Sequence, residues 1–585
     1  MMVKKIDPIT TEIIGNHLLS VAEEVAIAIV KSSYSNNIKE RRDLSTAVFD
    51  PDGNLIAQAE YVAMHLGSLI YTIKAIFEKF PISEINDGDV FAGNDPYGGG
   101  GSHLPDITIA TPVFSNNKLI AWVANCAHHS DIGGKVPGSL CSDAIDIYQE
   151  GLRIPLLKIC EGGKLNKAII DLLMINSRIP KERYGDLMAQ IAGNSVGYNR
   201  IIDAYKNWGN VMIDCMYTLE DYTERRLRAG IKKLPDGEYY YEDYMDPAEC
   251  FGNLPGKICV RVIKRNDHMS FDFTGTVKQV KSPLNMTYNA LIACVFYSVK
   301  TMIDPEAPTN AGISRTFDVV AEEGTIINCK SPAAVGQRID TAQRVVDAIF
   351  GALAPIVGNR AQAASSGTCH TISFAGYDPM KKDQYVLYLE VIAGGLGAFM
   401  DMDGLNGAQA HMTNTSNLPV EALETEIPLL NVHSYRLLTN SGGAGKYRGG
   451  LAIERKYKIL ADNVVCSILT DRQKILPWGL DGGYHGLGGT NTVQRSGEEE
   501  RKLPAQVSGL ILNKGDFITV TPPGGGGYGN PFERNIESVL SDVLAGYIDM
   551  EEAEKYGVKI SMKEGRYTIN QSETKKIRNL HINKK

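Results

Sequence analysis

The feature that most constrains the fold is a pair of β-prone segments joined by a short polar turn. Ile107–Val113 and Leu119–Ala127 are rich in apolar and β-branched residues, and the Ser-Asn-Asn-Lys sequence between them has the residue types of a tight turn. If the segments pair antiparallel about that turn, the residue numbers of partners sum to roughly 233. Asp106 is then expected to face Ala127.

This pairing brings imidazoles and carboxylates to one end of the hairpin, although they are up to 28 positions apart: His103, Asp106, His128, His129 and Asp131. Such side chains are good ligands for zinc, manganese or iron(II). Adjacent residues of a regular strand point to opposite faces, so His128 and His129 cannot both bind one metal there. One would bind the metal while the other orients substrate or relays a proton.

From the residues alone, two interpretations of this group stay open. A catalytic metal or acid–base site is favoured, because four of the eleven histidines fall between residues 65 and 129. The alternative is a hydrogen-bonded polar cluster that ties loops together. The glycines at 98–101 and 133–134 would let the backbone approach a ligand closely.

The first 80 residues predict a helix and a second hairpin. Asp7-Pro8 is typical of a helix start, and the apolar spacing that follows predicts a helix to about Ser32. Asp50-Pro51-Asp52-Gly53 is a turn sequence between two short apolar runs. Asp43 precedes the first run and His65 follows the second. Charged residues at strand ends are usually solvated, so this position alone does not make Asp43 a site residue.

The character of the chain changes near residue 233. Residues 165–233 have the apolar spacing of long packed helices, whereas later segments are mostly short alternating runs split by turns. We therefore predict an α+β, multi-domain protein. Its three parts are a mixed N-terminal α/β region with the metal site (1–233), a β-rich mixed region (234–530) and a C-terminal helical tail (531–585).

Glycine-rich stretches in the second half resemble phosphate-binding loops only superficially. SGGAGKYRGG (441–450) and TPPGGGGYGNP (521–531) lack the GK[ST] ending of a P-loop. GGLGA (394–398) lacks the strand, GxGxxG, helix order of a dinucleotide site. We interpret the first two stretches as tight turns at sheet corners.

Composition disfavours several classes of protein. With 43% hydrophobic and 22% charged residues the chain is globular, and its net charge of -8 does not favour a nucleic-acid or anionic-membrane partner. We find no secretory apolar segment and no stretch of the roughly 18 uncharged apolar residues that span a bilayer. The ten cysteines are scattered without a CxxC pair. A cytoplasmic protein with reduced thiols is expected.

A series of long, irregular blocks resembles the hydantoinase B/oxoprolinase family. In chain order the blocks are ERRDLSTAVFD, MHLGS, NDPYGGGGSHLPDITIATPVF, AHHSDIGGKVPGS, QEGLRIP, GDLMAQIAGN, FDFTGT, HMTNTSNLPVEALE, SGGAGKYRGG, LTDRQKILPWGL and TPPGGGGYG. The family holds the B-type subunits of ATP-dependent N-methylhydantoinases and 5-oxoprolinases. It also holds the related alpha subunits of acetone and acetophenone carboxylases.

The resemblance implies a division of labour between two subunits. An A-type subunit with an actin-like ATPase fold would bind ATP and phosphorylate the substrate, and the B-type subunit would complete hydrolysis of a lactam or hydantoin. The expected partners are thus this ATPase subunit, in a hetero-oligomer, and a small cyclic amide. The alternatives are a subunit of an ATP-dependent ketone carboxylase and, in another class, a non-catalytic scaffold for the ATPase.

The resemblance also implies roles for individual residues. The aspartate of the ERxD block joins the histidines of the SHLPD and AHH blocks at a divalent metal, with zinc or manganese expected. Matched residue by residue, the candidate ligands are Asp43, His103 and His128, with Asp106 as a fourth candidate. His129 and Asp131 become the candidates for proton transfer or substrate orientation. The sequence departs from the family at GGGGSH, where many members read GGTHLPD.

Overall fold

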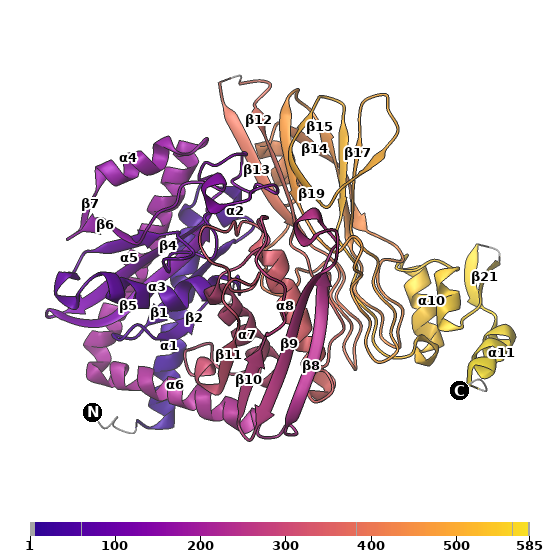
Figure 1. Ribbon diagram of the computed structural model, residues 1–585, viewed down its shortest axis with the longest axis horizontal. Helices are drawn as coiled ribbons and strands as arrows, with labels where there is room; N and C mark the ends of the chain where they lie inside the picture. The colour runs from indigo at the N-terminus through magenta and orange to yellow at the C-terminus, as the bar shows by residue number, and fades with distance from the viewer. Residues whose placement is uncertain (1–5, 60, 382, 564, 583–585) are drawn as a thin grey trace.

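A seven-stranded sheet forms the centre of the N-terminal half in the computed structural model, which describes residues 6–59, 61–381, 383–563 and 565–582 (Figure 1). The strand order is β2-β1-β5-β4-β3-β6-β7. The strands are β1 (Leu44–Phe49), β2 (Leu55–Gln58), β3 (Val90–Gly93), β4 (Asp106–Ser115), β5 (Lys118–His128), β6 (Leu157–Glu161) and β7 (Lys164–Leu165).

Helices cover both faces of this sheet because its strands alternate apolar side chains between two cores. Val48 and Val123 pack with the helices of one face, while Phe49 and Trp122 pack with those of the other. The first face carries α1 (Pro8–Ser32), α5 (Pro180–Trp208) and α6 (Asn210–Ile231), and the second carries α3 (His65–Lys79), α7 (Tyr288–Ile303) and α8 (Arg338–Leu353). Two shorter helices are α2 (Asn36–Lys39) and α4 (Lys167–Ile175).

Helix α1 starts as predicted, with the Asp7 carboxylate accepting a hydrogen bond from the backbone N–H of Thr10 at 3.0 Å. It is long and apolar enough to cross a membrane by length and composition, although Glu12, Glu23 and Glu24 interrupt its apolar run. In the fold one face of the helix packs into the core below the sheet. A Cβ at Gly193 of α5 would lie 2.4 Å from Ile29 of α1, so this glycine lets the two helices pack closely.

A second, four-stranded sheet packs on the far side of α8. Its order is β11-β10-β9-β8, from β8 (Gly237–Met245), β9 (Gly256–Arg265), β10 (His268–Asp272) and β11 (Phe317–Val320). All 16 residues of α8 are buried between neighbouring layers. Helix α8 is therefore held on every side, and any side chain at its N-terminal end is held firmly in place.

Two further sheets form a sandwich around a separate apolar core. One has the order β13-β12-β16-β19 and the other β14-β15-β20-β17-β18. The elements are β12 (His370–Tyr377), β13 (Tyr385–Ile392), α9 (Val420–Glu426), β14 (Leu430–Leu437), β15 (Ile453–Ile459), β16 (Val464–Leu469), β17 (Thr490–Gln494), β18 (Arg501–Leu503), β19 (Gln506–Leu512) and β20 (Phe517–Thr521). The α+β class is thus confirmed.

The β4–β5 hairpin forms as predicted, but its register differs by one residue from the prediction. Near the turn Phe114 pairs with Leu119, and beyond a bulge at Ile120 the pairing shifts, so that Asp106 faces His128 instead of Ala127. A bulge inserts one unpaired residue into one strand. Residues directly opposite one another share a face of the sheet, so the bulge places His128, and not His129, on the face of Asp106.

The glycine-rich stretches are not tight turns, which corrects our interpretation. Apart from Thr521, which ends β20, and Pro531, which begins a 3-10 turn, they run outside helices and strands and are bonded to one another through the backbone between the sandwich and α10 (Figure 1). The Gly443 and Gly525 N–H groups donate to the carbonyls of Gly525 and Gly450, each at 2.9 Å. A Cβ at Gly525 would lie 1.9 Å from the carbonyl oxygen of Leu396. Glycine is needed because the backbones themselves are the packing surface.

The C-terminal tail lies at one end of the molecule, beyond these segments (Figure 1). It contains α10 (Ile536–Leu544), β21 (Ile560–Lys563), β22 (Arg566–Ile569) and α11 (Gln571–Ile582). The predicted helical tail therefore also includes a β-hairpin. Val539, Tyr556 and Val558 form a small core that includes Ala444 of the glycine-rich region, which joins the tail to the body.

The glycine packing predicts a sharp difference between two alanine substitutions. Gly525→Ala should lower the free energy of unfolding by at least about 3 kcal/mol, because its Cβ meets an immobile backbone carbonyl. Gly376→Ala on β12 is the matched control, since its Cβ meets only side-chain and Cα atoms at 3.6 Å or more, and should change stability by less than about 1 kcal/mol. Chemical denaturation measures both. Equal stabilities would contradict the packing described here.

Candidate metal centre

Three adjacent strands bring the first members of the site together. Strand β5 lies between β1 and β4, and its last residue, His128, faces Asp106 at the start of β4. On the other side the N–H of His128 donates to the carbonyl of Asp43, just before β1, at 3.0 Å. The ends of three strands thus gather one imidazole and two carboxylates, all buried.

Two more histidines complete the group from segments outside the strands. His103 lies three residues before Asp106, and its Nε2 is 3.2 Å from Asp106 Oδ1. His65 is the first residue of α3, and its Nε2 is 3.4 Å from the same oxygen and 3.7 Å from Asp43 Oδ1. The rings of His103 and His128 lie with centroids 4.9 Å apart. All four sequence candidates for metal ligands therefore meet, together with His65.

The two oxygens of Asp106 have different surroundings. Oδ2 accepts hydrogen bonds from Ser102 Oγ at 2.6 Å and from Arg338 Nη2 at 2.9 Å. Oδ1 has no hydrogen-bond donor among the described residues. Burial favours the neutral acid, but the charges of His103 and Arg338 outweigh it and hold the pKa of Asp106 well below its usual range. Arg338 is permanently charged, so its part of this lowering remains when the imidazole is neutral.

The second unpartnered atom at this point is Nε2 of His103. Its Nδ1 lies 3.3 Å from the carbonyl oxygen of Gly336, which can only accept, so the ring proton belongs on Nδ1. Burial, and then the charge of Arg338, lower the pKa of His103, which keeps the ring neutral. The lone pair of Nε2 consequently faces a carboxylate oxygen 3.2 Å away. Two acceptors that face one another in a dry site need a cation between them.

His128 is held by the short helix α2. The Asn37 amide nitrogen donates to the His128 carbonyl at 2.7 Å and lies 3.1 Å from Nδ1 of the ring. Arg41 in turn donates to the Asn37 amide oxygen. Burial lowers the pKa of His128 to about 3, so this imidazole is also neutral near pH 7. In this arrangement Nδ1 accepts from Asn37, so binding a metal through Nε2 would require the Asn37 amide to rotate and to give up its bonds to the His128 carbonyl and to Arg41.

These side chains line a small cavity of about 50 Å³. Its polar lining includes Arg41, Asp43, His65, His103, Asp106, His128, Arg338, Thr371, Thr413 and Thr415. Space for a water needs roughly 10–15 Å³, so the cavity has room for a cation and a few water-sized ligands. Nitrogen and carboxylate donors in a partly open site fit a catalytic zinc or manganese ion. The residues present therefore fit the implied metal.

His129 and Asp131 do not line this cavity. His129 points into the opposite layer, where its Nε2 lies 2.9 Å from Gln190 Oε1 of α5. Asp131 pairs with Arg178 at 2.9 Å and accepts a backbone N–H from Gly138. Both side chains hold loops and helices in place here. The regular strand geometry that separates His128 from His129 explains why only the first reaches the site.

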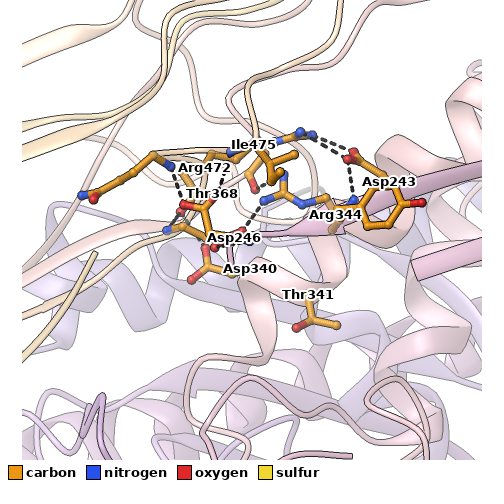
Figure 2. A network of polar contacts seen from close by, with 12 residues as sticks. Asp243, Asp246, Asp340, Thr341, Arg344, Thr368, Arg472 and Ile475 are labelled. Carbon is orange, nitrogen blue, oxygen red and sulfur yellow. Dashed lines mark hydrogen bonds and ion pairs between the residues drawn. The ribbon is translucent and has the colours of Figure 1, made fainter. Parts of the chain in front are cut away.

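Helix α8 brings Arg338 to the site, and a buried ion network holds that helix (Figure 2). Arg344 of α8 pairs with Asp471, while Asp340 accepts the Thr368 hydroxyl at 2.8 Å. Arg472 pairs with Asp243 at 2.8 Å and with Asp347 at 2.7 Å. The network joins α8, β8 and the segment after β16, so Arg338 projects from a rigid base.

Sequence reasoning misses two residues of the site, Arg338 and His65. Arg338 contacts Asp106 from 232 positions away, and no local pattern marks it. The sequence marks His65 only as the residue after a strand, although MHLGS is one of the matched blocks. A second potential ligand group, His65, Asp106 and Cys126, shares the central carboxylate.

Comparison with known proteins identifies the family of the chain. The hydantoinase B/oxoprolinase family profile matches residues 7–531. The chain belongs to this family. It is 34% identical to the B-type component of a putative D-/L-hydantoinase of Pseudomonas sp. strain NS671, over 96% of each chain. It is 31% identical to the 5-oxoprolinase of Dictyostelium discoideum over 90% of this chain, which spans 40% of that longer protein.

Two solved structures share the fold over nearly the whole chain. The ATP-dependent caprolactamase from Pseudomonas jessenii matches with a TM-score of 0.91 at 28% identity, covering 98% of this chain and 100% of that one. A nucleotide-free acetone carboxylase also matches with a TM-score of 0.91, at 19% identity, covering 99% of this chain and 83% of that one. At that identity the second likeness concerns the fold alone.

The contact between Arg338 and Asp106 predicts a coupled pair of substitutions. Arg338→Met leaves a buried carboxylate without its cation and should destabilise the metal-free protein by about 3–5 kcal/mol. Adding Asp106→Asn should recover much of that loss, because the buried charge is gone. The control, Arg261→Met, breaks only an exposed pair with Glu238 and should cost less than about 1 kcal/mol. Denaturation curves that show additive losses for the double variant would refute this coupling.

Proposed function

We propose that the protein is the B-type subunit of an ATP-dependent cyclic-amide hydrolase of the N-methylhydantoinase or 5-oxoprolinase type. The observation that carries the proposal is the pair of facing acceptors, His103 Nε2 and Asp106 Oδ1, at 3.2 Å in a buried cavity. Family membership indicates the reaction class, and relatives named for hydantoins, 5-oxoproline and caprolactam support a cyclic amide as substrate.

A divalent metal, zinc or manganese, would be held by Asp43, His103, Asp106 and His128. Such an ion supplies Lewis-acid polarisation and a water of lowered pKa at neutral pH. The chain's own residues prepare the donors: Arg338 and Ser102 occupy Oδ2 of Asp106 and leave Oδ1 facing the cavity. Arg41 lies 3.7 Å from Asp43 Oδ2, so its positive charge balances that of the carboxylate.

His65 is the residue we assign to proton handling at the cavity wall. Its Nε2 faces both Asp106 and Asp43, and its Nδ1 lies 3.3 Å from the hydroxyl of Ser45, whose own hydrogen is donated to the Leu44 or the Val62 carbonyl. Nδ1 therefore carries the ring proton, and Nε2 offers its lone pair to a proton at the cavity wall. We assign His129 and Asp131, the sequence candidates for this role, to positioning, because neither lines the cavity.

ATP chemistry belongs to a partner in this proposal. The sequence has no P-loop, and the hydantoinase and caprolactamase relatives are each named as one subunit of an enzyme, which implies other subunits in those complexes. We infer an A-type ATPase subunit in a hetero-oligomer. We further infer a cytoplasmic location, because all ten cysteines are free thiols, as in a reducing compartment.

The two alternative functions, a ketone carboxylase and a non-catalytic scaffold, would need different features of the site. A ketone carboxylase would need bicarbonate for turnover, and the acetone carboxylase likeness supports only a shared fold. A non-catalytic scaffold would have no use for the facing acceptors or for the arginines whose charges balance both carboxylates. We therefore favour the hydrolase.

The functional test uses the chain co-expressed with its ATPase partner. Purified complex should cleave ATP only when a hydantoin, 5-oxoproline or lactam is present, without bicarbonate. His103→Ala should remove the bound metal and lower hydrolysis by at least about 100-fold, since a donor to the ion is lost. His433→Ala on β14 is the control and should keep both the bound metal and the rate of hydrolysis. Unchanged metal content and activity in His103→Ala would support the scaffold instead.

The lowered pKa values of His103 and His128 predict that the metal stays bound at lower pH than at ordinary histidine ligands. Protons compete with metal for an imidazole only as the pH approaches its pKa. Because burial lowers the pKa of His103 and takes that of His128 to about 3, the loss of bound metal with falling pH, at a fixed free metal concentration, should begin below pH 6.5. Metal analysis after equilibration at each pH measures this. A steep loss near pH 6.5, the ordinary histidine value, would contradict it.

A further inference from the structure

The metal cavity holds a balance of charge that a metal ion would change. Among the described residues, the arginines and aspartates that line it are Arg41, Arg338, Asp43 and Asp106. The two guanidinium charges balance the two carboxylate charges, and the imidazoles of His103 and His128 are neutral. A divalent ion therefore leaves two positive charges in excess. A buried charge is stable only with a compensating charge, so the cavity with its metal favours an anionic ligand.

Arg41 is the more weakly compensated of the two arginines. Its side chain is fully buried, and its Nη2 lies 3.7 Å from Asp43 Oδ2, beyond the distance of a normal hydrogen bond. Its Nη1 donates to the Asn37 amide oxygen, and at 3.4 Å to the Leu389 carbonyl. Its Nε has no hydrogen-bond partner among the described residues. A buried guanidinium with an N–H to spare is suited to an oxyanion.

Thr415 supplies a hydroxyl beside this guanidinium. It ends the segment 409–415, which together with the segment 61–66 separates the metal cavity from a second cavity of about 700 Å³. Its Oγ1 lies 3.5 Å from Nη2 of Arg41 and accepts from it. Among the described residues, its own hydrogen is donated to no acceptor, whereas Thr371 of the same lining donates to the Cys369 carbonyl at 3.0 Å. A buried hydroxyl hydrogen needs an acceptor, which a ligand can provide.

Arg338 presents a second set of donors to the same cavity. Its Nε donates to Ser102 and its Nη2 to Ser102 and Asp106, which leaves Nη1 without a hydrogen bond to a described residue. Burial raises the pKa of the Cys369 thiol to about 12, and the charges of Arg41 and Arg338 both lower it. Because Cys369 lines the cavity, the two arginines act on one shared volume.

The ligand that suits these donors is a phosphoryl group. Guanidinium N–H groups and a hydroxyl match its oxygens, which carry about the two negative charges that the cavity with its metal lacks. Each of these oxygens is about the size of a water, so the group fits the cavity of about 50 Å³. Inorganic phosphate and small phosphate monoesters are therefore probes of the right size.

A phosphoryl group bound to Arg41 brings the reacting carbon to the metal. In an amide activated on its oxygen, that oxygen bridges the phosphorus and the carbon that water attacks. Arg41 is 3.7 Å from Oδ2 of Asp43, a candidate metal ligand, and His65 Nε2 is 3.7 Å from Oδ1 of the same carboxylate. The apolar side chains of Val62 and Leu389 also line the cavity and suit the carbon atoms of a ring.

We propose that Arg41 and Thr415, together with Arg338, bind the phosphoryl group of the activated cyclic amide beside the metal. This rests on the proposed function and adds to it the residues that hold the activating group of the substrate. None of the three residues is a candidate metal ligand. Binding of the phosphoryl group and binding of the metal are therefore separable by mutation.

The test measures binding of inorganic phosphate to the full, manganese-loaded chain by calorimetry. Thr415→Val removes one hydroxyl at nearly constant volume and should weaken binding about tenfold, the effect of one lost hydrogen bond to a charged group. Arg41→Gln should weaken binding at least about 30-fold, because a charge and its N–H donors are lost. Equal manganese content in the variants and the wild type shows that the metal site is intact.

The matched control is Thr72→Val on α3. Thr72 is a buried threonine outside the cavity lining, and its hydroxyl bonds only the backbone carbonyls of Ser68 and Gly99. This variant should bind phosphate as the wild type does. Metal-free wild-type protein should bind phosphate at least about tenfold more weakly than the loaded protein, because its arginine and aspartate charges already balance.

Competition identifies the source of the phosphoryl group. Methyl phosphate, a monoester, should displace inorganic phosphate, whereas bicarbonate at the same concentration should not. If methyl phosphate fails to compete, the site belongs to free phosphate released by the reaction, and the assignment to the substrate is overturned. Displacement by bicarbonate alone would indicate the anion site of a carboxylase and would overturn it too.

Phosphate affinity that Arg41→Gln and Thr415→Val leave unchanged would also overturn the assignment. This failure is distinguishable from failure of the proposed function. A chain that binds no divalent metal, or a complex that does not couple ATP cleavage to opening of a cyclic amide, contradicts the proposed function. Phosphate binding that is independent of Arg41 in a metal-loaded, active complex contradicts the phosphoryl site alone.

Discussion

The site depends on one contact, the pairing of the fully buried Asp106 with Arg338. A buried carboxylate is stable only with a compensating charge, and Arg338 supplies it through a single oxygen. This pairing favours the ionised form of the carboxylate. Its other oxygen, Oδ1, faces His103 and has no hydrogen-bond donor among the described residues. Because Arg338 begins α8, the contact also joins the seven-stranded sheet to the layers behind it. The ion pair between Asp106 and Arg338 therefore both prepares the site and holds these layers together.

Local signals in the sequence predict a large part of this arrangement. The Asp7 cap, the turns and the alternation along β4 and β5 depend only on residues close together in the sequence. The turn and the alternation are enough to bring the start of β4 beside the end of β5. The register could not be predicted to one residue, because the bulge that leaves Ile120 unpaired has no signal in the residue pattern of the hairpin. That single residue decides which of two adjacent histidines, His128 or His129, faces Asp106.

The sequence could not predict contacts between residues that lie far apart in the chain. Arg338 and His65 reach the site from helices packed on the sheet, and their positions follow from three-dimensional packing alone. The glycine runs mislead for a related reason. A glycine is usually interpreted as a turn residue, yet Gly443, Gly450 and Gly525 serve to let backbones touch. Whether a glycine bends a chain or lets another segment approach is visible only when the neighbour is known.

The cavity of the candidate metal centre is separated from a second cavity of about 700 Å³ by the segments 61–66 and 409–415, and this has a consequence for how such a protein can diverge. Ala63 and Asn414 line the second cavity, while their neighbours Met64 and Thr413 line the cavity of the candidate metal centre. A substitution at one of these positions can therefore alter the volume and polarity of one cavity without changing the lining of the other. The linings of the two cavities become separately heritable traits of one short stretch of chain.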